Sequence, residues 1–132
     1  MRRIVRSVVV VSLVALAPPP PLAPAQTPAT GRLMREKLAH TQRILEALTT
    51  SNYDLLARES VALSQVTNAP AWTVLKMPEY RRHSEEFLRI VEDLAAAAKD
   101  RDLDLAAVRF GALTMSCYQC HRYIKNMRLA KY

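Results

Sequence analysis

Residues 114–128, TMSCYQCHRYIKNMR, contain both cysteines of the chain, and a histidine directly follows the second. Cys117 and Cys120 are three residues apart, so on a helix their thiols project from the same side, with His121 beside them. A Cys-x-x-Cys pair is compatible with four chemistries: a metal site, a redox dithiol, a disulfide, or covalent attachment of a larger group. The cellular compartment and the surrounding fold decide between them.

Three of these chemistries make no use of the histidine in this pattern. A structural zinc site needs four ligands, commonly two cysteine pairs or a pair with two spaced histidines, and the chain has no second cluster. A thioredoxin-like dithiol follows a strand in a βαβ unit, and no stretch here alternates as a strand does. A disulfide between residues three apart closes too small a loop to constrain the unfolded chain much.

The N-terminal residues predict export. Three arginines within residues 1–6 precede an apolar run over residues 7–17 and then a proline-rich segment with small residues. This is the pattern of a secretory signal peptide, and the run is too short for a membrane span, which needs about 20 apolar residues. We expect cleavage after Ala25, so that residues 1–25 are removed and the chain is periplasmic, without stable membrane insertion.

The charge of the exported chain is mildly basic. Removal of the signal peptide leaves 16 Lys and Arg against 12 Asp and Glu, a net charge of about +4 instead of +7. These charges are dispersed along the sequence, whereas a nucleic-acid footprint gathers Lys and Arg on one face. We therefore expect no nucleic-acid partner, and a modest preference for acidic protein surfaces. About 107 residues make one domain with a small core.

The pattern of apolar residues predicts an all-α protein. Gly and Pro are confined to joints after residue 31, with one exception inside the last segment, and the apolar positions recur with helical spacing. Short joints favour antiparallel neighbours, so we expect an up-down-up-down four-helix bundle over residues 31–132, preceded by a disordered stub at 26–30. The expected helices cover residues 32–50, 52–67, 78–100 and 100–127.

Covalent haem attachment uses all three residues of the motif. Cys-x-x-Cys-His is the c-type signature, in which two thiols bond the vinyl groups of one porphyrin and the histidine binds the iron. An exported, all-helical chain suits this chemistry. The sequence therefore predicts one haem c, attached through Cys117 and Cys120, with His121 as the proximal iron ligand.

With CYQCH in its last helix, close to the C-terminus, the chain resembles the cytochrome c′ superfamily of class II c-type cytochromes. The resemblance covers residues 31–128, and Lys125 matches the basic residue that members carry one turn after the haem histidine. The resemblance implies a four-helix bundle with haem at one end, and it is compatible with a homodimer. Classical members leave one side of the iron open under an apolar residue, whereas a low-spin branch places a methionine there.

The first predicted helix offers a residue for each design. Leu33 suits the five-coordinate design and Met34 the six-coordinate one. Met34 shares an apolar stripe with Leu38, Thr41, Leu45 and Leu48, so we expect Met34 to face inward and Leu33 to lie about 100° away. His83 is the rival ligand, although its charged surroundings favour a boundary position. The expected topology brings these residues to the end of the bundle that holds the motif, together with Trp72 and Met77.

The expected function is one-electron transfer with redox partner proteins, the iron being held between His121 and Met34. Methionine ligation would raise the reduction potential relative to a bis-histidine site with His83. No nucleophile paired with a base stands out in the sequence, so we expect no enzymatic turnover. A five-coordinate protein that binds nitric oxide or carbon monoxide is the main alternative, and a helical interaction module without haem is the third.

Overall fold

The computed structural model describes residues 28–73 and 75–129, and within them the chain is helical with no strand. The predicted all-α class is therefore confirmed. The predicted signal peptide, residues 1–25, lies outside the described residues. The helices are α1 (Pro28–Thr49), α2 (Tyr53–Gln65), α3 (Pro78–Lys99) and α4 (Leu103–Leu129), and two short 3-10 helices, η1 (Val66–Asn68) and η2 (Pro70–Trp72), follow α2.

Local side chains set where the helices begin. The Asn52 carboxamide oxygen accepts a hydrogen bond from the Leu55 amide at 3.0 Å, as expected for the residue that caps α2. Asp102 caps α4 in the same way. We expected a disordered stub at residues 26–30, yet α1 begins at Pro28. Proline suits a first helical turn because its missing amide hydrogen is not needed there.

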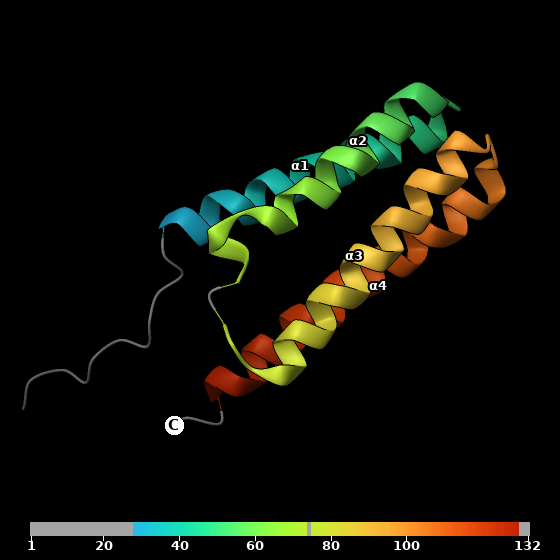
Figure 1. The fold of residues 1–132 in the computed structure, drawn as a ribbon. Helices are drawn as coiled ribbons and strands as arrows, with labels where there is room; N and C mark the ends of the chain where they lie inside the picture. The colour runs from blue at the N-terminus through green and yellow to red at the C-terminus, as the bar shows by residue number, and fades with distance from the viewer. Residues whose placement is uncertain (1–27, 74, 130–132) are drawn as a thin grey trace, which may run out of the picture.

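The helices associate as two pairs. α1 packs along α2, α2 along α3 and α3 along α4, whereas α1 and α4 contact each other much less. Figure 1 shows the pairs close together where the turns at residues 50–52 and 100–102 lie, and diverging toward the opposite end. At that diverging end lie the start of α1, the joint between α2 and α3, and the last turns of α4.

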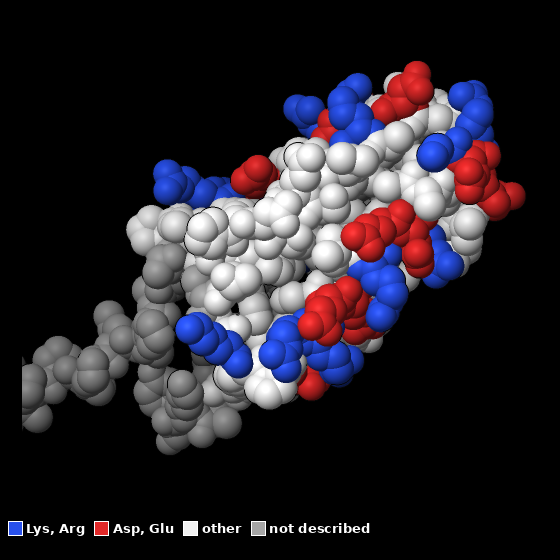
Figure 2. All heavy atoms as spheres, in the orientation of Figure 1, with Lys and Arg blue, Asp and Glu red and all other residues white. Residues whose placement is uncertain are grey.

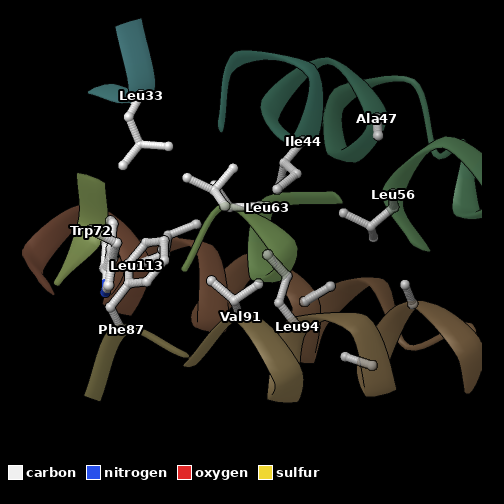
Figure 3. Close-up of a cluster of buried hydrophobic side chains, with 14 residues drawn as sticks. Leu33, Ile44, Ala47, Leu56, Leu63, Trp72, Phe87, Val91, Leu94 and Leu113 are labelled. Atoms are coloured by element: carbon white, nitrogen blue, oxygen red, sulfur yellow. The ribbon is translucent and has the colours of Figure 1, made fainter. Parts of the chain in front are cut away.

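The core lies between the pairs and is built mainly from aliphatic side chains. The most deeply buried large residues come from all four helices: Ile44, Leu56, Leu63, Phe87, Val91, Leu94 and Leu113. Figure 3 shows Ile44 and Leu63 above Val91 and Leu94, while Leu33 projects from α1 toward Trp72 and Phe87. Burial of such side chains is the main term that stabilises a domain of this size.

The apolar stripe predicted to be buried along α1 is displaced by one residue from the stripe that is buried in the structure. The side chains buried along this helix are Leu33, Lys37, Ile44 and Ala47, whereas Leu38 is 56% and Leu45 48% exposed. The helix is thus turned about 100° from the expected orientation. Its apolar residues form two adjacent stripes, and the outer one contains more leucine. The inner stripe includes a lysine, which a search for apolar periodicity passes over.

The surface in Figure 2 carries Lys, Arg, Asp and Glu side chains interspersed with one another, beside a wide uncharged area. This face therefore shows no concentrated basic patch. In addition, none of the described helices combines the length and apolar character that a membrane span requires.

A buried carboxylate links α1 and α2. Glu59 is 3% exposed, and its Oε2 lies 2.8 Å from Nδ1 of His40. Its Oε1 lies 3.5 Å from Nη1 of Arg43 and 3.5 Å from Nε of Arg58. The hydrogen bond with His40 lowers the pKa of Glu59, with a further contribution from Arg43, and burial opposes them. His40 of α1 therefore faces α2.

We predict that Glu59→Gln lowers the free energy of unfolding by about 1–3 kcal/mol at neutral pH, because it leaves buried donors poorly paired. The pKa of Glu59 is lower in the folded protein than the ordinary value of 4.5. The carboxylate therefore stabilises the fold above that ordinary value, and this stability is lost as pH falls through the folded pKa. Urea unfolding at pH 7 and pH 3.5 measures both effects.

The matched control is Glu85→Gln, since Glu85 is an exposed carboxylate that pairs with Arg81 at 3.8 Å. We expect this control to change stability by less than about 0.5 kcal/mol and to keep the pH dependence of the wild type. An equal pH dependence in Glu59→Gln and the wild type would contradict the role of Glu59.

Candidate functional site

The cysteine motif lies in the second half of α4, on the part of the helix that runs into the diverging end (Figure 1). Cys117 and Cys120 are free thiols and both are half-buried. Cys117 packs against the hydrophobic core. Leu113 and Ser116, just before the motif, are buried, whereas His121 is exposed. The motif thus sits where α4 passes from the core to the surface.

Lys37 of α1 is the buried charge at this end. It is 7% exposed, and its ammonium nitrogen lies 3.7 Å from the ring centroid of Phe87 and 4.7 Å from that of Trp72. The two rings also contact each other, with centroids 5.3 Å apart. An aromatic face attracts a cation through its quadrupole, and the lysine stem adds apolar contact. Lys37, Trp72 and Phe87 together form what we term the lysine cage.

The lysine cage and the two thiols influence each other through their charges. Burial lowers the pKa of Lys37, and the negative charges that Cys117 and Cys120 carry when ionised oppose this effect. Burial in turn raises the pKa of the Cys120 thiol, while the Lys37 charge lowers it. Leu33 of α1 is part of the hydrophobic core against which Cys117 of α4 packs.

The imidazole of His121 is affected by the same surroundings. Although the residue is exposed overall, partial loss of solvent lowers its pKa, and the charge of Lys37 lowers the pKa further. A lower pKa favours the neutral ring at physiological pH. The neutral imidazole is the form that binds a metal, so these surroundings favour a ligating state of His121.

His83 of α3 is buried, contrary to the expected boundary position. It is 6% exposed, its ring lies 5.6 Å from that of Tyr123, and its Nε2 is 3.7 Å from a carboxylate oxygen of Glu79. Its Nδ1 has no hydrogen-bond partner among the described residues. The charged neighbours in the sequence lie on the outer faces of α3, so His83 itself packs between α3 and α4.

The joint between α2 and α3 is held by hydrogen bonding and aromatic contact. The hydroxyl of Tyr80 donates a hydrogen bond to the carbonyl oxygen of Trp72. Burial raises the pKa of Tyr80, and the charge of Cys120 raises it further. Its hydrogen bond fixes η2, which carries the indole of Trp72 to the lysine cage.

The remaining predicted residues occupy different environments. Met34 is partly buried and packs against the core, while Leu33 is 6% exposed, so Leu33 is the more deeply placed of the two. Met77 is also partly buried, directly before α3, and Lys125 is exposed. Gly111 of α4 faces open space, since no neighbouring side chain or other element lies within 4 Å of where its Cβ would be.

Lys37 is the residue of this end that sequence reasoning missed. It follows Leu33 by four residues and precedes Ile44 by seven, so its spacing matches the buried stripe of α1. A lysine at a core position of a helix is rarely fully buried unless it has a partner. Its spacing along α1, combined with the rarity of lysine at core positions, was the signal that could have identified Lys37 from the sequence.

Among the described residues, no three His, Cys, Asp or Glu side chains gather closely enough to hold a metal ion. A zinc site made by the motif and a second cluster is therefore not found in this part of the chain. Comparison of the sequence with protein-family models and curated proteins, and of the fold with solved structures, finds no match.

We predict that Lys37→Met raises the free energy of unfolding of the protein without any added ligand by about 1–3 kcal/mol. A buried charge without an anionic partner costs more than its aromatic contacts return, and methionine fills a similar volume. Urea unfolding measures the change. Lys125→Met removes an exposed charge at the same end and should change stability by less than about 0.5 kcal/mol. A marked loss of stability in Lys37→Met would show that the cation–aromatic contacts dominate.

Proposed function

We propose that the chain is an exported c-type haem protein that carries single electrons between redox partner proteins in the periplasm. In this proposal the helices form an antiparallel up-down-up-down bundle with one haem c at the diverging end. Cys117 and Cys120 hold the haem by two thioether bonds, and His121 binds the iron. When bound, the haem iron takes up and releases one electron, and the protein residues tune that exchange.

The observation that carries the proposal is the placement of the motif. Two free, half-buried thiols lie one turn apart on α4, at the end where the helix pairs diverge, and α1 faces them. His121 follows on the same helix, with its neutral form favoured. This arrangement supports a large covalently bound group better than a small metal ion, for which the described residues offer no ligand cluster.

Two buried polar groups at this end also suit an additional occupant. The ammonium of Lys37 is buried against aromatic rings, and Nδ1 of His83 has no hydrogen-bond partner among the described residues. Such groups are rare inside folded proteins because each costs desolvation energy. A haem brings two propionate groups and a metal centre, which can pair with the ammonium of Lys37 and with the imidazole nitrogen that lacks a partner among the described residues.

Met34 remains the proposed sixth ligand. It lies in the first turns of α1, at the diverging end, and it packs against the core without being fully enclosed. Its unbranched thioether has three rotatable bonds, so it can adapt its direction to an iron held by α4. A carrier of single electrons needs no bond to form or break on the distal side of the haem. This agrees with the expectation that the protein performs no enzymatic turnover.

A second candidate function is favoured by the burial of Leu33. At 6% exposure, Leu33 is the deeper of the two adjacent residues and projects toward Trp72 and Phe87 (Figure 3). A leucine over the distal side leaves the iron five-coordinate and open to nitric oxide or carbon monoxide. Binding of such gases is therefore the alternative function of the same site.

We expect the full-length chain, expressed together with a c-type haem attachment system, to stain for haem on a denaturing gel. The stain should disappear when Cys117 and Cys120 are both replaced by serine, because non-covalent haem is lost under denaturing conditions. His121→Ala should keep some stain but alter the optical spectrum, whereas His40→Ala, outside the site, should leave the spectrum unchanged. A wild-type protein without haem would refute the proposed function.

Carbon monoxide added to the ferrous protein separates the two candidate functions. If Met34 binds the iron, the wild type resists carbon monoxide, while Met34→Ala binds it rapidly and changes from a low-spin to a high-spin spectrum. Met115→Ala, which removes an exposed methionine of α4, serves as the matched control and should behave as the wild type. Fast and complete binding by the wild type would contradict Met34 ligation and support the five-coordinate alternative.

A further inference from the structure

A second set of side chains along α4 faces away from the core. Its members are spaced alternately by four and three residues, so they lie on one line along the helix surface. The side chains of Tyr118 and Arg122 contact each other there, with the guanidinium carbon 5.5 Å from the ring centroid. We call this set the outer stripe of α4, and all of its members are exposed: Asp104, Val108, Gly111, Met115, Tyr118, Arg122 and Lys125.

The middle of the outer stripe is apolar although it faces solvent. Its larger side chains are among the most exposed apolar ones of the described residues: Val108 at 68%, Tyr118 at 56% and Met115 at 53%. Within residues 105–121 the only Lys, Arg, Asp or Glu is Arg109, whose guanidinium lies 3.5 Å from a carboxylate oxygen of Asp93 on α3. The solvent side of a helix is normally polar, and continuous exposed apolar surface marks an interaction site.

The centre of the outer stripe is open. α4 buries Ala106, Leu113 and Ser116, which lie on the opposite half of the helix from Gly111 and Met115. No neighbouring side chain or other element lies within 4 Å of where a Cβ of Gly111 would be. Glycine is unfavourable inside a helix, but it lets another backbone approach closely. The middle of this stripe can therefore receive a second helix.

Charges of opposite sign stand at the two ends of the outer stripe. Asp104 lies in the first turn of α4, and no acidic residue follows it in this helix. Arg122 and Lys125 lie near the other end of the helix. A face of one charge sign repels a copy of itself, whereas a face with opposite ends can pair with itself when the two copies run antiparallel.

An antiparallel second copy matches the outer stripe position by position. The positions that then face each other lie equally far from residue 113: Asp104 with Arg122, Val108 with Tyr118, and Gly111 with Met115. Opposite charges meet at both ends of such a pair of helices, and apolar or small residues meet between them. A parallel arrangement would set Asp104 against Asp104 and Arg122 against Arg122, which costs free energy.

We propose that the outer stripe of α4 is a self-association surface, on which a second copy of this chain docks antiparallel about a two-fold axis near residue 113. This inference goes beyond the proposed function and does not rest on it, since no residue of the outer stripe is a proposed haem ligand. The apolar middle excludes water, and the end charges set direction and register. From Asp104 to Lys125 the stripe extends over about 32 Å of helix.

Sedimentation equilibrium of the exported protein at neutral pH and low salt tests the proposal. We expect a mass twice that of one chain. Val108→Glu should weaken self-association by at least about 100-fold, because the two-fold interface then buries an unpaired carboxylate twice. Val61→Glu is the matched control, since Val61 of α2 is also an exposed valine, at 49%, and this variant should dimerise as the wild type does. Circular dichroism checks that both variants keep the helical content of the wild type.

Exchange of the end charges tests direction and register. Asp104→Arg and Arg122→Asp each place like charges opposite one another at both ends, so each should weaken the dimer about tenfold or more. The chain that carries both substitutions should dimerise as the wild type does, because opposite charges face each other again. An equimolar mixture of the two single variants should form a heterodimer for the same reason.

Several results would overturn the inference. A wild-type protein that stays monomeric as its concentration rises would do so, and the outer stripe would then belong to a different partner. A dimer that survives Val108→Glu, or one that Val61→Glu dissociates, would place the interface on another face. Failure of the double charge variant to restore the dimer would contradict the antiparallel pairing. Haem staining is a separate measurement, so the proposed function and this inference can fail independently.

Discussion

The contact between α1 and α4 is the constraint on which the proposed site depends. The two helices contact each other less than any sequential pair, yet Leu33 of α1 is part of the core against which Cys117 of α4 packs. Packing of α2 on α3 brings the two helix pairs together at one end, and the pairs diverge toward the other end (Figure 1). The residues that could hold a large group therefore gather where the helices are least tightly joined.

Lys37 also links the energetics of the fold to the proposed chemistry. We expect a cation buried against Trp72 and Phe87 to destabilise the chain relative to a methionine of similar volume, since solvation lost on burial is only partly replaced. Proteins often accept such a cost at a functional site. Nδ1 of His83, packed against Tyr123, lies at the same end, and it has no hydrogen-bond partner among the described residues.

Much of the fold could be predicted from the sequence, because the helix ends carry local signals. The cap at Asn52, the acids before α4 and Pro78 at the start of α3 act over a few residues and need no knowledge of neighbours.

The orientation of α1 could not be predicted in this way. Leu38 and Leu45 mark the more hydrophobic stripe, yet the helix buries Leu33 and Lys37, because the aromatic cage supplied by α3 and η2 makes a lysine position part of the interior. The burial of His83 was also missed, because the charged residues next to it in the sequence suggested an exposed position, whereas their side chains point away from His83. Which residue, Met34 or Leu33, would cover the iron of the proposed haem stays a prediction.

The mass of the intact protein, exported by a host with a c-type haem attachment system, tests the central claim most directly. If Cys117 and Cys120 hold a haem, the measured mass equals that of the processed chain plus one haem, and the same addition appears on the peptide that contains both cysteines. A mass equal to the chain alone, with the two cysteines recovered as free thiols or as a disulfide, would contradict the account. The same spectrum reports where the chain is cleaved, since each N-terminus gives its own mass.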